Sequence, residues 1–125
     1  MSDAPKLITI YTTRGDVGGF LAYPYIFSRS GEWIGWVTQD QRVFSVHGHW
    51  VGRMTGEPRI LRKREFGNSE PRRTPPQVPA PIRIPERIPL PGMMAEIATN
   101  EVDVLDELPE LLPPVDAGEL RDDMD

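Results

Sequence analysis

The stretch YIFSRSGEWIGWV, residues 25–37, is followed at residues 42–54 by RVFSVHGHWVGRM, which repeats its pattern. In both, an apolar and an aromatic residue precede a short polar run, a glycine, a tryptophan and a second glycine. A third copy lies at residues 9–21, and Ile60 and Leu61 begin a fourth. The period of 16 to 17 residues is too short for the common helical repeats and suits one β-hairpin per copy. The sequence therefore predicts a chain of β-hairpins.

The glycines and tryptophans of the repeat have different expected places in a hairpin. The first glycine of each copy falls at the tip, where a tight hairpin needs a positive φ. The second lies inside the returning strand, where glycine usually marks a bulge or the close approach of another backbone. We expect the tryptophans to pack in a shared core; the alternative is an aromatic rim that stacks a ligand. The repeat residues are Gly15, Gly19, Gly31, Trp33, Gly35, Gly48, Trp50 and Gly52.

Strand-forming residues dominate each unit and turn residues separate the units, which predicts a small all-β domain of tandem hairpins. Units of the type IFSRSGEWIGWV resemble those of the bacterial four-fold β-flower domains. The resemblance covers about residues 7–66 and implies short hairpin petals arranged with approximate four-fold symmetry. It implies a fold and no particular activity.

The predicted domain spans residues 1–70. Its units cover about residues 7–22, 25–38, 42–55 and 59–70. Two positions depart from the family pattern: the first unit has Val17 where tryptophan is expected, and the fourth has no recognisable returning strand. Completion of the fourth petal by residues 66–91 or by another chain is left open.

Beyond the domain the composition changes. All ten aromatic residues lie between Tyr11 and Phe66, whereas eight of the fourteen prolines lie at residues 71–91. Because proline fixes φ and has no amide donor, residues 71–91 are predicted to be an extended linker. Isoleucines at 82, 84 and 88 indicate that part of it lies along the β domain.

Residues 92–125 are predicted to form a disordered acidic tail, in which Asn100 favours a short helix over residues 101–108. Apolar residues alternate there with acids, which is typical of a motif that folds on a protein partner. The motif residues are Val104, Leu105, Leu108 and Leu112. The alternative is a tail that only increases solubility.

Charge divides at the same boundary. Residues 1–73 carry a net charge of +4 and residues 74–125 a net charge of −9. The cations near the end of the β region are candidate contacts for anionic lipid or nucleic acid. Two other roles for these cations are open: they belong to a solvated edge strand, or they contact the acidic tail of the same chain. The candidate residues are Arg53, Arg59, Arg62, Lys63 and Arg64.

Few residues offer chemistry. His47 and His49 flank a tip glycine, but the chain has no cysteine, and zinc needs at least three protein ligands. Ser28, Ser30 and Ser45 lack the surroundings of a nucleophile elbow. We therefore predict no catalytic residue, metal or cofactor. The favoured function is a non-enzymatic binding or scaffold module; surface binding of anions comes second and a hydrolase built on the tips third.

Two further observations bear on location. The first residues show no secretory signal pattern, and no apolar stretch approaches the roughly 20 residues that span a bilayer. These observations predict a cytoplasmic protein. The oligomeric state is left open.

Overall fold

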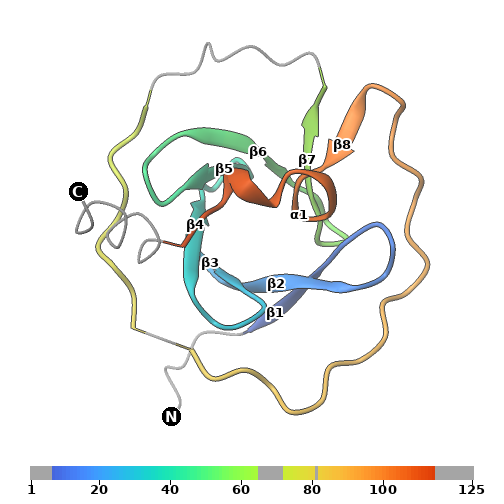
Figure 1. Cartoon of the computed structure of the whole chain (residues 1–125), viewed down its shortest axis with the longest axis horizontal. Helices are drawn as coiled ribbons and strands as arrows, with labels where there is room; N and C mark the ends of the chain where they lie inside the picture. The colour runs from blue at the N-terminus through green and yellow to red at the C-terminus, as the bar shows by residue number, and fades with distance from the viewer. Residues whose placement is uncertain (1–6, 65–71, 81, 115–125) are drawn as a thin grey trace.

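The structure, a computed structural model, describes residues 7–64, 72–80 and 82–114. The described residues form eight antiparallel strands, each hydrogen-bonded to the next in chain order, in a sheet that curls into a ring (Figure 1). The strands are β1 (Ile8–Tyr11), β2 (Val17–Ala22), β3 (Tyr25–Ser28), β4 (Trp33–Val37), β5 (Arg42–Ser45), β6 (Trp50–Met54), β7 (Ile60–Lys63) and β8 (Glu101–Asp103). The predicted all-β fold of tandem hairpins is confirmed.

The apolar–aromatic pair of each unit separates the two faces of the sheet. Ile10, Ile26, Val43 and Ile60 are its first members, and each is 0% exposed in the central core. The next residue of each pair faces outward, because side chains alternate along a strand. Phe27, for example, belongs to a second cluster on the outer face. One position of the repeat thus supplies the centre of the ring.

In each of the first three units the second glycine lies opposite this central residue, as Gly35 does opposite Ile26. A Cβ on Gly35 would stand 2.5 Å from the carbonyl oxygen of Phe44 in the next petal. The corresponding distances are 2.4 Å for Gly19 and 2.3 Å for Gly52. The absence of a side chain therefore lets neighbouring petals pair closely.

The three hairpin tips share one geometry. Gly15, Gly31 and Gly48 have φ values of 92°, 88° and 89°. In the third tip, the Gly48 nitrogen donates to the Ser45 carbonyl, and the Ser45 hydroxyl accepts from the backbone nitrogens of His47 and His49. A hydroxyl residue three positions before the glycine thus fixes the turn.

The fourth petal is completed by a distant part of the chain. β8 returns beside β7, with Leu61 opposite Asp103, and the Arg64 nitrogen donates to the Asn100 carbonyl at 2.7 Å. The two strands therefore form a hairpin with residues 65–99 inserted at its tip. Neither of the alternatives left open by the sequence, residues 66–91 or another chain, supplies this strand.

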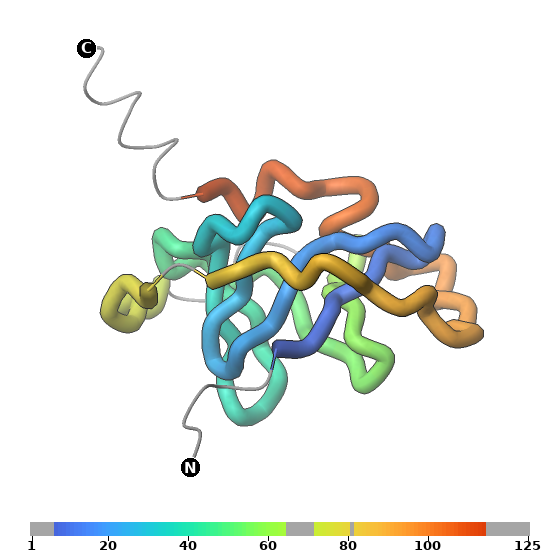
Figure 2. The backbone as a smooth tube through the Cα atoms, turned by 90° about the horizontal axis from the view of Figure 1, so that it is seen from below, coloured from blue at the N-terminus to red at the C-terminus, as the bar shows by residue number. Residues whose placement is uncertain are grey.

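The described residues of 72–100, here called the belt, run around the outside of the ring (Figures 1 and 2). The belt reaches the third tip at Arg73, the second at Ile82, the first at Pro91 and the fourth at Asn100, at intervals of nine residues. Its isoleucines 82, 84 and 88 pack against the outer aromatic cluster. The Pro-rich segment is thus extended, and it covers the aromatic face of the first two petals.

Residues 104–112, here called the plug, lie over the centre of the ring (Figure 1). They comprise helix α1 (Val104–Glu107) and the 3-10 turn η1 (Pro109–Leu111). Asp103, and not Asn100, caps α1 by accepting from the Asp106 nitrogen. Val104 and Leu112 are buried in the core.

Residues 101–112 therefore differ from the expected disordered tail, because the open fourth petal and the apolar ring centre give them a place to fold. The last part of that predicted tail, residues 115–125, lies outside the described residues.

Candidate functional site

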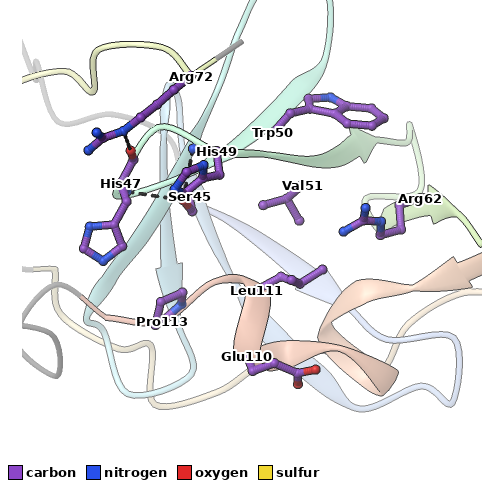
Figure 3. Close-up of a pocket in the computed structure, with 10 residues that line it drawn as sticks. All are labelled: Ser45, His47, His49, Trp50, Val51, Arg62, Arg72, Glu110, Leu111 and Pro113. Carbon is purple, nitrogen blue, oxygen red and sulfur yellow. Dashed lines mark hydrogen bonds between the residues drawn. The ribbon is translucent and has the colours of Figure 1, made fainter. Parts of the chain in front are cut away.

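A cleft of about 610 Å³ lies between the third tip, β7 and the plug; it is here called the tip cleft (Figure 3). The described residues that line it are Ser45, His47, His49, Trp50, Val51, Arg62, Arg72, Glu110, Leu111 and Pro113. Apolar side chains of Val51 and Leu111 lie between the histidines on one side and Arg62 on the other (Figure 3). Cationic and imidazole groups thus surround a small apolar patch.

Arg62 occupies a position that differs among the four petals. It follows the pair Ile60-Leu61 as Ser45 follows Val43-Phe44 and as Ser28 follows Ile26-Phe27. In those petals the hydroxyl fixes a tight tip, whereas the fourth tip carries the insertion of residues 65–99. The break in the repeat therefore brings an arginine to this place, and burial lowers the pKa of Arg62 from its ordinary value.

Arg72 enters the cleft because the belt is fastened to the third tip. The Arg73 nitrogen donates to the Gly48 carbonyl at 2.9 Å, and the Arg73 guanidinium lies 4.9 Å from the centre of the Phe44 ring. Gly48 also lacks the Cβ that would stand 1.9 Å from the Arg73 oxygen. With the backbone held in this way, Arg72 Nε donates to the His47 carbonyl at 2.5 Å (Figure 3).

The remaining polar groups do not form a catalytic arrangement around Ser45. Its hydroxyl accepts from two backbone nitrogens at 3.2 and 3.3 Å and so serves the turn. Glu110 is the one carboxylate among the described residues that line the cleft. Within residues 7–64, 72–80 and 82–114, no three metal-ligating side chains gather in one place. The tip cleft has the chemistry of a site that holds an anion through arginine and imidazole donors.

The five cations predicted from the sequence have separate places. Arg62 lines the tip cleft, and Lys63 lies beside it on the outer face of β7. Arg53 is 2.8 Å from Glu101 and Arg64 is 3.9 Å from Glu107, so both pair with acids of the returning segment. Arg59 is only 2% exposed, which removes it from the surface expected to contact anions.

Arg59 instead holds the structure together. Its terminal nitrogens donate to Glu57, to the Thr13 hydroxyl at 3.1 Å and to the Ala95 carbonyl at 2.9 Å. Arg72 belongs to the run of cations near the end of the β region, but its place in the tip cleft depends on how the belt meets the third tip.

The predicted protein-binding motif lies within the plug. Val104 is 0% and Leu112 3% exposed, while Leu105 and Leu108 pack against the same central core. The acids between them reach basic residues on the rim, as Asp106 does with Arg14 at 3.2 Å. Within the part of the chain that the structure describes, this motif therefore packs against the ring of the same chain.

The two repeat tryptophans, although equivalent in register, have different surroundings. Trp33 is 7% exposed, donates from Nε1 to the Gly35 carbonyl at 2.7 Å and meets Tyr25 edge to face. Trp50 is half-buried and lines the tip cleft. The core placement expected for both therefore describes Trp33, whereas Trp50 stands at the rim of a cleft.

Comparison with known proteins gives one family. The model of a family described as 4-fold beta flower protein matches residues 8–96, which include β1 to β7 and most of the belt. The curated proteins and the solved structures gave no match. Among the described residues, no helix is long and apolar enough to cross a membrane.

Proposed function

Because the chain belongs to the 4-fold beta flower family, and that membership assigns a fold and no activity, we propose a function from the site itself. The protein is a non-enzymatic binding module that holds an anionic group in the tip cleft. The observation that carries this proposal is the convergence of Arg62 and Arg72 on one cleft with two histidines.

The chemistry of these side chains supports an anionic ligand. A guanidinium donates in a planar fork that matches phosphate and carboxylate oxygens, and its hydrogen bonds to a charged acceptor are stronger than neutral ones. Arg62 and Arg72 come from β7 and the belt, so they can approach a ligand from different sides. The partial burial of Arg62 strengthens its interaction with an anion, because water screens it less.

The position of the cleft supports the same function. The first three petals repeat the same hydroxyl at the start of the tip, and such a repeat serves the fold. The fourth petal departs from it at Arg62, and the long insertion brings Arg72 to the same place. Where one unit of a structural repeat departs from the others and charged side chains gather, we expect a function that the fold itself does not require.

A broad basic surface for lipid or nucleic acid is less well supported. Arg53 and Arg64 each pair with an acid of the chain itself, and Arg59 is buried. These cations are therefore less able to contact a second polyanion. A protein partner that uses Val104 or Leu112 would first have to displace them from the ring.

Isothermal titration calorimetry with inorganic pyrophosphate at low salt tests the proposal. We expect saturable binding by the parent chain and a loss of about tenfold or more in affinity for R62Q and for R72Q, since a charged hydrogen bond contributes about 1.5–3 kcal/mol. R83Q is the matched control, because Arg83 is exposed on the belt. Equal affinity in all four proteins, or no binding by the parent, would contradict the proposal.

A further inference from the structure

We infer that the anion held in the tip cleft is the phosphate of a nucleoside phosphate, whose base stacks on Trp50. This inference rests on the proposed function and adds the class of ligand. It comes from a second cleft, of about 580 Å³, on the outer face of the sheet beside the first. We call it the outer cleft.

The two clefts meet at two residues. The outer cleft is lined by Trp50, Arg53, Leu61, Arg62, Lys63, Asn100 and Glu101, and of these Trp50 and Arg62 also line the tip cleft. One ligand can therefore occupy both clefts, with an aromatic ring and a cation at the point where it passes from one to the other. A nucleoside phosphate has a flat base at one end and a strong anion at the other.

Trp50 provides the flat surface. Its counterpart Trp33 belongs to the outer aromatic cluster, against which the belt isoleucines pack, and meets Tyr25 edge to face. Trp50 stays half-buried, and Leu61, 3% exposed, extends the apolar lining beside it. Bases stack on aromatic side chains in this way without regard to sequence.

Asn100 provides polar groups at the edge of the same surface. Its backbone carbonyl accepts from the Arg64 nitrogen at 2.7 Å, which fixes this residue beside β7. The side-chain amide has both a donor and an acceptor, as the edge of a base does, and such pairing is a common way to recognise adenine. Glu101, its neighbour, is engaged with Arg53 at 2.8 Å.

At the other end, the phosphate lies among Arg62, Arg72 and the third tip. Figure 3 shows Trp50 and Arg62 on the same side of the tip cleft, with Arg72 and His47 across from them. The path from base to phosphate therefore runs over Arg62.

A free nucleotide suits this path better than a polynucleotide. Glu101 and Glu110 lie in the two clefts, and the whole chain carries a net charge of −5, both of which oppose a long polyanion. A single nucleotide places its charge at the arginines alone.

The test compares four ligands by calorimetry without added metal: adenosine diphosphate, pyrophosphate, adenosine and a single-stranded oligoadenylate. We expect adenosine diphosphate to bind about tenfold or more tightly than pyrophosphate, with adenosine weakest, since stacking of one base contributes about that factor. The variants are W50L, N100A, R62Q and the control R83Q, each checked for an unchanged melting curve.

W50L should remove most of the advantage in affinity of adenosine diphosphate over pyrophosphate, whereas R62Q should weaken the binding of both ligands. Equal affinity for adenosine diphosphate and pyrophosphate in the parent would overturn the nucleotide inference and leave the anion site intact. Failure of both to bind would overturn both proposals. If the oligoadenylate binds more tightly per site than adenosine diphosphate, with a steep salt dependence, the ligand is a polynucleotide. That result would overturn the inference of a free nucleotide.

Discussion

Asp103 Oδ2 accepts hydrogen bonds from the backbone nitrogen of Thr13 at 2.7 Å and from its hydroxyl at 2.6 Å. Asp103 lies in β8, the last strand of the sheet, and Thr13 lies in the tip that follows β1, the first strand. These two strands are not hydrogen-bonded to each other. Thr13 in turn accepts from Arg59 at 3.1 Å. A buried carboxylate thus joins the two edges of the ring where the strand ladder does not.

Removing this carboxylate should open the ring. We expect D103A to lower the free energy of unfolding by about 2 kcal/mol or more, because Asp103 is only 1% exposed and its two part-buried hydrogen bonds to Thr13 are lost. Urea denaturation followed by circular dichroism measures the change. D106N is the control, since Asp106 pairs with Arg14, whose side chain is 74% exposed, and such pairs contribute little. Equal effects of the two variants would show that the Asp103 contact does not close the ring.

The close approach of neighbouring petals predicts a large effect at Gly35. A methyl group there would stand 2.5 Å from the Phe44 carbonyl oxygen, so the G35A variant must shift backbone in two strands. We expect a loss of about 2–4 kcal/mol, in the range of overpacked cores. Gly56 has nothing within 4 Å of the same added atom, and G56A should change stability by less than about 0.5 kcal/mol. Thermal melting that ranks the two in the opposite order would contradict the petal geometry.

The belt should be dispensable for folding of the ring but needed to cover its outer aromatic cluster. Since Arg64 and Asn100 are hydrogen-bonded, residues 65–99 can be replaced by a short tip such as Arg-Ser-Gly. We expect this chain to keep β circular dichroism and cooperative melting, with a stability loss of roughly 3 kcal/mol and new binding of a hydrophobic dye, because three isoleucines leave the aromatic cluster. If the shortened chain no longer folds, the belt is part of the core. If it folds but binds no dye, the belt does not cover the aromatic cluster.

The contact of Glu57 with the belt predicts that stability depends on pH. The Ala95 nitrogen donates to Glu57 at 2.9 Å, and this bond, together with Arg59, lowers the pKa of Glu57 from its ordinary value of 4.5. A pKa that is lower in the folded than in the unfolded state stabilises the fold above about pH 4.5, and this stabilisation is lost as the pH falls through the lower value. The melting temperature of E57Q should therefore fall less between about pH 6 and pH 3 than that of the parent. Parallel curves would show that Glu57 does not hold the belt.

The sequence predicted the first three petals because each is local. The pair Ile26-Phe27, the tip glycine and the glycine at 35 all lie within one short unit, and alternation along the strand places them on the two faces. The fourth petal could not be found in this way. Its returning strand follows an insertion, has three residues, and carries Asp103 where the second and third units have tryptophan.

The site was only partly predictable for the same reason. Arg62 stood out as one of several cations, but the sequence could not separate it from Arg59, whose burial depends on Thr13, Glu57 and Ala95 from other parts of the chain. Likewise, Val104 has the pattern of a partner-binding motif, and only the ring shows that its partner is internal. Tertiary contacts decided each of these roles.

The most direct test of the anion site uses the three tryptophans as internal reporters. Their indole N–H groups give separate signals in a nitrogen–proton correlation spectrum, recorded during titration with pyrophosphate. The account predicts a saturable shift of the Trp50 signal, at the rim of the tip cleft, while the Trp33 signal stays in place, because its N–H donates to Gly35 outside the cleft. Shifts confined to Trp33 or Trp36, or a Trp50 signal that does not move at saturation, would contradict it.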